Sequence, residues 1–168
     1  MSSADKNLSV FSVENLPDVG EKRFALVVAE WNTEVTESLA QGAYDTLVRY
    51  GAKPEHIVRG NVPGSYELTT AALWFAQRPD IDAVICIGCV IQGETKHNDY
   101  INHAVAQGLT NVSLQTSKPV IFGVLTPNTQ QQALDRAGGI HGNKGDEAAI
   151  TAIKMLGLRQ LVNERMSE

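Results

Sequence analysis

The segment from Gly88 to His97 holds the residues of this sequence that are best suited to chemistry. It reads GCVIQGETKH and differs at one position from the phosphate-loop pattern G-x-x-x-x-G-K-[ST], because Glu94 stands where that pattern has lysine. A carboxylate there would repel the phosphates of a nucleoside triphosphate, which argues against a triphosphatase. Gly93, Glu94 and Thr95 precede an expected helix, whose first N–H groups and positive dipole end can bind a single phosphate group.

His97 stands at the start of that expected helix, where the positive end of the dipole favours a neutral imidazole that can accept a proton. It is the candidate general acid/base, and the alternative is a helix-terminal histidine with only a capping role. The other histidines, His56, His103 and His141, lack the spacing of metal ligands, so we expect no metal site.

Three further residues suit ligand binding but also have ordinary structural explanations. Trp31 is flat and could stack on a heterocycle, or it could pack at the edge of the core. Glu67 could accept hydrogen bonds from ligand hydroxyl groups, or complement a helix dipole. Arg136, beside the glycine-rich basic loop 138–145, could bind phosphate with two N–H groups, or stabilise the carboxyl end of a helix.

Cys86 and Cys89 stand at Cys-x-x-Cys spacing, which raises the possibility of a redox pair. Redox cysteines lie at the start of a helix, whereas Cys86 lies within the apolar run AVICIG, which is typical of a buried strand. If the strand continues to Cys89, the two side chains point to opposite faces. We therefore expect structural cysteines, and no second Cys/His pair accompanies them to bind zinc.

Four apolar runs alternate with helical patterns and must position these residues. We expect strands at 23–30, 55–61, 82–88 and 119–125, and helices at 34–50, 66–77, 97–116, 127–137 and 145–166. Thr126 is expected to cap the fourth helix, with Pro127 at its first position. Residues 1–21 form a mostly polar arm, in which LSVFSV at 8–13 could add an edge strand.

This alternation predicts a single-domain three-layer α/β/α sandwich over 22–168, with a four-stranded parallel sheet that the arm's edge strand can extend. Ligands of such folds bind at the carboxyl ends of the strands. The candidate loops are therefore 31–32, 63–67, 89–97 and 126–128.

Composition excludes several classes of partner. A net charge of −5, a pI near 5.4 and the lack of a Lys/Arg cluster argue against binding to nucleic acid or an anionic membrane. The longest apolar run, 83–91, is far shorter than the ~20 residues of a membrane span. The amino terminus lacks the apolar core of a secretory signal, so we expect a cytoplasmic protein.

Four segments of the chain resemble the lumazine synthase family, in the family's order and at its spacing. They are VPGSYELT at 62–69, GCVIQGETKHNDY at 88–100, PVIFGVLT at 119–126 and RAGGIHGNKG at 136–145. The resemblance implies an enzyme of riboflavin biosynthesis that condenses 5-amino-6-(D-ribitylamino)uracil with 3,4-dihydroxy-2-butanone 4-phosphate. That reaction yields 6,7-dimethyl-8-ribityllumazine, phosphate and water from two small-molecule substrates, and needs no metal or redox cofactor.

The resemblance also implies roles for the residues at matching positions. Those implied to bind ribitylaminouracil are Trp31, by stacking, then Ser65, Tyr66 and Glu67, and the main chain of Cys89, Val90 and Ile91. Those implied to hold the butanone phosphate are Glu94, Thr95, Arg136 and Lys144, with His97 transferring protons. Phe122 matches a phenylalanine that the family supplies from the neighbouring subunit, so each site should straddle a subunit interface.

Family members form pentamers, and some assemble further into icosahedral shells. The loop 136–145 carries no insertion of the kind that keeps certain relatives pentameric, which permits a shell. Cys89 replaces a frequent threonine, Gln92 a common arginine and Glu94 a common small residue. The first change is harmless if only main-chain atoms bind, and a carboxylate at 94 favours phosphate contact through its N–H.

Two alternatives from other classes remain. One is a noncatalytic flavin- or lumazine-binding or shell-forming protein of the same fold, and the other is a flavodoxin-like or nucleotide-binding signalling domain. The set Trp31, Glu67, His97 and Arg136 favours the enzyme, because assembly alone needs none of them. The signalling domain would need a complete phosphate loop or an acidic cluster, which the chain lacks.

Overall fold

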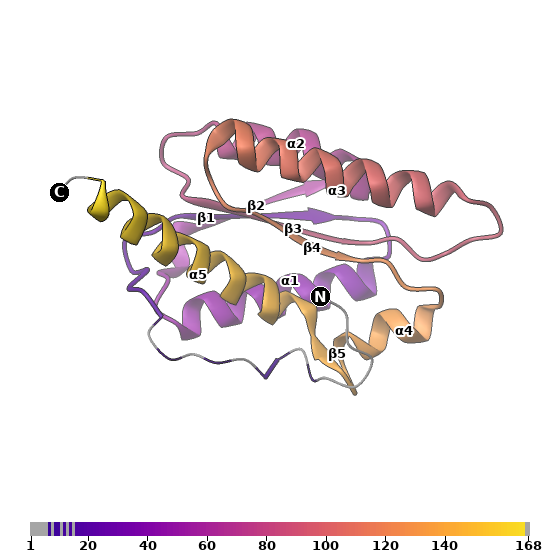
Figure 1. Ribbon diagram of the computed structural model, residues 1–168. Coiled ribbons are helices and arrows are strands. Elements are labelled where there is room, and N and C mark those ends of the chain that lie inside the picture. The colour runs from indigo at the N-terminus through magenta and orange to yellow at the C-terminus, as the bar shows by residue number, and fades with distance from the viewer. Residues whose placement is uncertain (1–6, 8, 11, 13, 15, 167–168) are drawn as a thin grey trace.

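A four-stranded parallel sheet forms the middle layer of the protein, as seen in the computed structural model, which describes residues 7, 9, 10, 12, 14 and 16–166 (Figure 1). The strands are β1 (Phe24–Ala29), β2 (Ile57–Val62), β3 (Ala83–Cys89) and β4 (Val120–Leu125), in the order β2-β1-β3-β4. Each strand agrees to within two residues with an expected apolar run. The predicted four-stranded parallel sheet is therefore confirmed.

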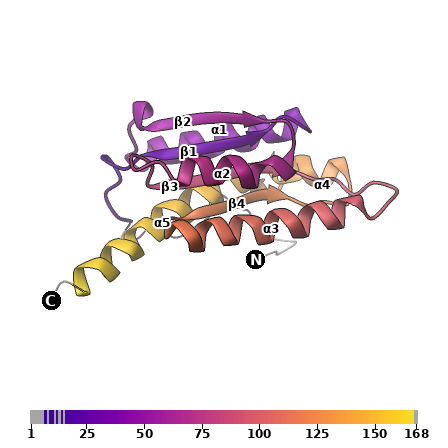
Figure 2. The same cartoon turned by 90° about the horizontal axis from the view of Figure 1, so that it is seen from above.

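Helices cover both faces of the sheet, as the alternation of strands and helices predicts. They are α1 (Thr33–Arg49), α2 (Leu68–Ala76), α3 (His97–Thr116), α4 (Gln130–Asp135) and α5 (Lys144–Arg165), with short 3-10 helices η1 (Pro54–His56) and η2 (Ser65–Glu67). Figures 1 and 2 show α2 and α3 on one face and α1 and α5 on the other. The three-layer α/β/α sandwich is thus confirmed.

Burial explains why the central strands are apolar throughout. Leu26 and Val28 of β1 pack in the core beneath α1 and α5, whereas Ala25 and Val27 pack in the core beneath α2 and α3. Successive side chains of a strand point to opposite faces, so a strand covered on both sides needs apolar residues at every position. The predicted stripe of α1 is also confirmed, since each of its four members is buried: Val35, Leu39, Ala43 and Leu47.

The fourth helix is shorter than predicted, and Thr126 does not cap it. The cap of α4 is Thr129, whose hydroxyl accepts a hydrogen bond from Gln132 N at 3.2 Å, while the Gln132 side chain accepts one from Asn128 N at 2.8 Å. Pro127 lies before the helix and its carbonyl accepts a hydrogen bond from Gln92 N at 3.0 Å. The spacing Thr-x-x-Gln is that of a capping box, a stronger start signal than Thr-Pro.

The glycine-rich loop after Arg136 is in fact an antiparallel hairpin of β5 (Ala137–Gly139) and β6 (Gly142–Asn143). Gly138 and Gly142 have φ values of 99° and 81°, a backbone conformation that side chains disfavour. These glycines therefore specify a tight hairpin instead of an irregular loop.

The amino-terminal arm joins the core near its end, where Val19 is buried against it. Of the predicted edge strand at 8–13, Ser9, Val10 and Ser12 are described and none is in a strand, while 8, 11 and 13 lie outside the described residues. The division into an arm at 1–21 and a domain at 22–168 stays a prediction. Among the described residues, no helix combines the length and apolar character that crossing a membrane requires.

Candidate active site

A cavity of about 600 Å³ opens at the carboxyl ends of β1, β2 and β3. Parallel strands bring their carboxyl ends to one edge of a sheet, so loops far apart in sequence meet there. The volume is in the range of sites for small molecules. The lining residues are Trp31, Asn32, Gly64, Ser65, Tyr66, Glu67, Cys89, Val90, Ile91, Gly93, Thr95, His97, Asn98 and Ile101.

The loop after β1 places an exposed aromatic side chain at this cavity. Asn32 has a left-handed backbone conformation with φ 62°, which asparagine tolerates better than most residues, and its Nδ2 donates a hydrogen bond to Cys89 O at 2.8 Å. This bond ties the loop to the end of β3. Trp31 consequently stands 73% exposed beside the cavity, where its ring is free to stack on a planar ligand.

The segment after β2 contributes a buried hydroxyl group that has no hydrogen-bond partner. Ser65 in η2 is only 6% exposed, lines the cavity, and its Oγ has no partner among the described atoms. A buried unpaired hydroxyl costs free energy, so it favours a ligand that can hydrogen-bond to it. A Cβ on Gly88 would lie 2.6 Å from this Oγ, so the glycine of β3 gives Ser65 its space.

Glu67 lies beside Gly64 on the same rim, since a Cβ built on Gly64 would lie 3.2 Å from the Glu67 Oε2 atom. The carboxylate is exposed and none of the described cations forms a salt bridge with it. A carboxylate in this setting is available to accept hydrogen bonds from ligand hydroxyl groups.

The segment after β3 contains the sequence that resembles a phosphate loop, and it leads to the start of α3. Val90 N and Gln92 N donate hydrogen bonds to Leu125 O at 2.8 Å and Pro127 O at 3.0 Å, which fixes the first part of the loop against the end of β4. The cap residue of α3, Lys96, makes no side-chain capping bond. The side chain of the cap residue therefore does not compete for the first N–H groups of this helix, a setting in which an anion can bind.

His97 and Thr95 lie together at that helix start. The Thr95 hydroxyl accepts a long hydrogen bond of 3.4 Å from His97 N, and both residues line the cavity. The His97 side chain is exposed. An exposed imidazole at the mouth of a site can exchange protons with a bound ligand and with water.

The structure brings most of the predicted site residues together, and leaves four outside the cavity lining. Those that line the cavity are Trp31, Ser65, Tyr66, Glu67, Cys89, Val90, Ile91, Thr95 and His97. Those outside its lining are Glu94, Phe122, Arg136 and Lys144, and the loop 126–128 after β4 does not line it either.

Three of the four residues outside the lining belong to the part of the chain that follows α3. Phe122 is on the edge strand β4 and is 37% exposed. Arg136 ends α4 and its Nη1 donates a hydrogen bond to Gln132 O at 3.1 Å. Lys144 begins α5 and its Nζ pairs with Glu147 at 2.8 Å.

Several residues that line the cavity were not predicted from the sequence. Among them, Asn98 and Ile101 follow His97 by one and four residues on α3. The four-residue step puts Ile101 on the same helix face as His97, and this spacing could have identified it. Asn32 lies in the candidate loop 31–32, but no role was predicted for it.

The two cysteines are structural, as predicted. Cys86 packs in the core beneath α2 and α3, and Cys89 in the opposite core, and neither forms a disulfide. Burial raises the pKa of the Cys86 thiol far above its usual range and raises the pKa of Cys89 to about 11. In the described part of the chain, no three His, Cys, Asp or Glu side chains converge as a metal site would require.

Comparison with known proteins gives one consistent family. Residues 21–160 match the model of the family described as 6,7-dimethyl-8-ribityllumazine synthase. Proteins of that name from Cytophaga hutchinsonii and Parabacteroides distasonis are 58% and 51% identical to this chain, each over 93% of the chain and 98% of the relative. One from Flavobacterium johnsoniae is 50% identical over 95% of this chain and 84% of the relative.

Proposed function

Because the chain belongs to the 6,7-dimethyl-8-ribityllumazine synthase family, we infer that it condenses 5-amino-6-(D-ribitylamino)uracil with 3,4-dihydroxy-2-butanone 4-phosphate. The product is 6,7-dimethyl-8-ribityllumazine, and phosphate and water are released in this penultimate step of riboflavin biosynthesis. Identity of 50–58% to relatives over nearly their whole length carries the conclusion that the protein is a transferase of this kind. A noncatalytic binding or shell protein is not favoured.

The reaction proceeds by steps that require positioning and proton transfer. The 5-amino group of the pyrimidine attacks the ketone, and water leaves to give an imine. Phosphate is then eliminated, and the ribitylamino nitrogen attacks the carbonyl that this elimination generates, with loss of a second water, to close the ring. Holding two reactants in the correct orientation can remove roughly 7–11 kcal/mol of the barrier. The enzyme therefore needs one subsite for the pyrimidine, one for the phosphate, and a group that moves protons between them.

The pyrimidine subsite consists of the residues after β1, β2 and β3. Trp31 stacks on the pyrimidine ring. Glu67 accepts hydrogen bonds from the ribityl hydroxyl groups, Ser65 exchanges hydrogen bonds with them, and Tyr66 lies beside the ribityl group. The unpaired Oγ of Ser65 supports this assignment, because a ribityl hydroxyl would satisfy it. The segment Cys89 to Ile91 offers main-chain groups to the uracil edge.

The phosphate subsite begins at the amino terminus of α3. Thr95 and the N–H groups at Glu94 and beyond bind the phosphate. Glu94 is outside the cavity lining, so its carboxylate need not face the phosphate. His97, beside them, shuttles protons to and from the amine, the ketone and the leaving water. Each of these roles uses the exposed rim of the cavity.

A neighbouring copy of the chain completes each site in this proposal. Phe122, Arg136 and Lys144 are outside the lining of their own chain's cavity, so we assign them to the cavity of the next subunit, where Phe122 closes over the pyrimidine. Arg136 and Lys144 then meet the phosphate. A closed ring of copies, a pentamer that can assemble into an icosahedral shell, satisfies this arrangement. We expect this assembly in the cytoplasm.

Mixing purified protein with both substrates and following lumazine fluorescence tests the function. The two compounds react slowly by themselves, so the comparison is with the same mixture without protein. Acceleration that requires both substrates supports the synthase. A rate equal to the control, from protein with an intact circular dichroism spectrum, would contradict it. Light scattering on the same sample tests the pentamer or shell, and a monomer would contradict the shared site.

A further inference from the structure

The hairpin β5–β6 separates the two cations that the proposed function assigns to the phosphate. Arg136 directly precedes β5 and Lys144 directly follows β6. Their main chains are joined, because Lys144 N donates a hydrogen bond to Arg136 O at 2.9 Å. The geometry of this hairpin therefore sets the distance between the two positively charged residues.

Ser38 of α1 holds both strands of the hairpin. Its hydroxyl donates a hydrogen bond to Ala137 O at 2.5 Å, next to Arg136, and its carbonyl accepts one from Asn143 Nδ2 at 2.9 Å, next to Lys144. One residue of α1 thus ties down the first and the last position of the hairpin.

Asn143 makes the opposite connection, from the hairpin to two helices. Its Nδ2 donates to α1 at Ser38, and its Oδ1 accepts a hydrogen bond from Gly145 N at 2.7 Å, which caps α5. The arm adds a third contact, since Asn143 N donates to Ser9 Oγ at 3.0 Å. Both polar atoms of the Asn143 side chain, which directly precedes Lys144, are therefore hydrogen-bonded.

Close packing between α1 and α5 leaves this network no room to shift. A Cβ on Gly42 would lie 2.6 Å from Asn143 Nδ2, and a Cβ on Gly145 would lie 1.9 Å from Leu39 O. Glycines at both positions allow the start of α5 to rest directly on α1. Since Asn32, the cap residue directly before α1, lines the cavity, this one helix connects the cavity of a chain to its cation pair.

We propose that Asn143, together with Ser38, is a positioning residue that sets the spacing of Arg136 and Lys144 for the substrate phosphate. This inference rests on the proposed function of those two cations. A phosphate carries two charges on a compact group, so two cations bind it well only at a fixed separation. Hydrogen bonds from α1 to the first and last residues of the hairpin fix that separation before the substrate binds. Binding then does not lose free energy to ordering the two cations.

Asn143→Ser tests the proposal because serine can still cap α5 but cannot reach Ser38 O. Ser38→Ala removes the hydroxyl bond to the other strand, and Asn111→Ser, on the exposed side of α3, is the matched control. The readouts are the KM values of both substrates, inhibition by inorganic phosphate, and the thermal melting temperature.

Asn143→Ser should raise the KM of the butanone phosphate and the inhibition constant of inorganic phosphate about 10-fold, because misplaced binding groups lose much of their effect. The KM of ribitylaminouracil should not change. Ser38→Ala should have a smaller effect of roughly 3-fold, since one neutral hydrogen bond is lost. In an Arg136→Ala background, Asn143→Ser should add less than about 2-fold, because the two residues act through one interaction.

Three results would overturn the positioning role. In the first, Asn143→Ser and Ser38→Ala change neither the KM of the butanone phosphate nor the inhibition constant of inorganic phosphate, while Arg136→Ala has a large effect. Arg136 would then bind phosphate without any positioning by Asn143. Equal increases in both KM values, or a large fall in melting temperature, would indicate general damage to the fold. An Arg136→Ala variant with unchanged constants would reject the phosphate subsite itself, and the positioning role with it.

Discussion

The rim of the cavity and the hairpin side of the molecule differ in how completely one chain builds them. At the rim, three loops meet because the parallel sheet brings their strands to one edge, and nine predicted residues line one cavity. On the hairpin side, Phe122, Arg136 and Lys144 are held by β4, the end of α4 and the start of α5, and none of them lines that cavity. The fold of one chain therefore explains the rim, whereas the proposed assembly is what would bring Phe122, Arg136 and Lys144 to a cavity.

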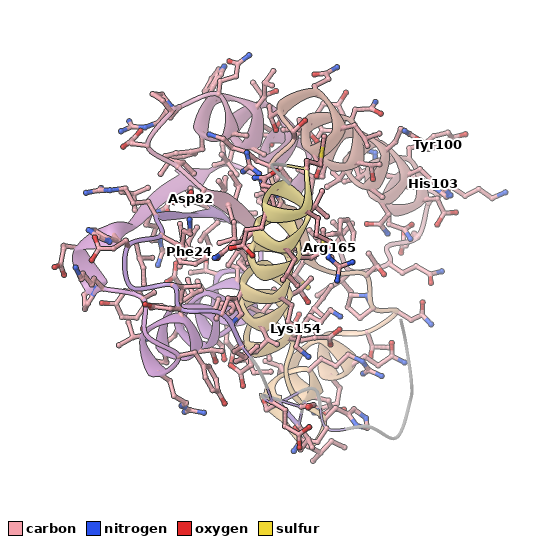
Figure 3. The ribbon with its side chains drawn as sticks, turned by 60° about the vertical axis from the view of Figure 1, so that its left-hand side comes forward. Phe24, Asp82, Tyr100, His103, Lys154 and Arg165 are labelled. Carbon is pink, nitrogen blue, oxygen red and sulfur yellow. The ribbon has the colours of Figure 1, made fainter. Side chains whose placement is uncertain are left out.

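Replacing His97 should have the largest effect and should act on turnover alone. His97→Ala is expected to lower kcat roughly 100-fold while leaving some acceleration over the uncatalysed reaction, because orientation of the substrates persists. Steady-state kinetics measures this. His103→Ala is the control, since His103 is on the same helix at the outer edge of the molecule (Figure 3). An unchanged kcat in His97→Ala would show that His97, and with it the rim, does not transfer protons in the reaction.

Replacing Arg136 should separate the two regions most clearly. Arg136→Ala is expected to raise the KM of the butanone phosphate about 50-fold, as a charge-assisted hydrogen bond is lost, with little change in the KM of ribitylaminouracil. Arg165→Ala is the control, because Arg165 also ends a helix but is at the end of α5 opposite Lys144, far from α4 and β5 (Figure 1). If both variants have the same KM for the butanone phosphate, Arg136 does not bind the phosphate and only stabilises the end of its helix.

Replacing Trp31 should sharpen the account of the rim. Trp31→Ala is expected to raise the KM of ribitylaminouracil about 10-fold, which is the usual worth of one stacking contact. Trp74→Ala provides the comparison, since Trp74 is 67% exposed on α2 and does not line the cavity. A greater effect on the KM of the butanone phosphate would place the pyrimidine elsewhere.

Thiol reactivity should show the smallest effect. With its pKa raised from 9.0 to about 11, Cys89 carries about 100-fold less thiolate at pH 8 than a free thiol. Native protein should therefore react with iodoacetamide only slowly at pH 8, and faster as the pH approaches the raised pKa. Unfolded protein is the control. Rapid labelling of the native protein, detected by mass spectrometry, would mean that the end of β3 opens and exposes Cys89 to solvent.

The sequence predicted what local patterns and the sheet determine. The limits of α3 agree with the expected 97–116, because a helical stripe and the flanking loop mark both ends. Thr126 and Pro127 were misread as a helix start, since the capping pair Thr129 and Gln132 was overlooked. The left-handed conformation of Asn32 follows from its bond to β3, a contact between residues distant in sequence, so no local pattern shows it.

The place of Phe122 illustrates a different limit. It was assigned to the site only through the family resemblance, and the chain by itself leaves it on the surface of an edge strand. No periodicity or spacing within one chain encodes whether Phe122 meets a second copy, or on which surface. Lys144 was likewise assigned only through the resemblance, whereas Arg136 was also a candidate from its position beside the glycine-rich loop.

Mixed assemblies test the shared site most directly. One variant, Trp31→Ala/Glu67→Gln, lacks a working rim, and the other, Arg136→Ala, lacks the phosphate cation. The two are refolded together at equal amounts, and lumazine formation is compared with each variant refolded alone. If neighbouring chains share each site, about one quarter of the sites regain all wild-type residues, and activity rises well above the mean of the two variants. Activity that equals that mean, in assemblies proven to be mixed, would show that each chain builds its site alone.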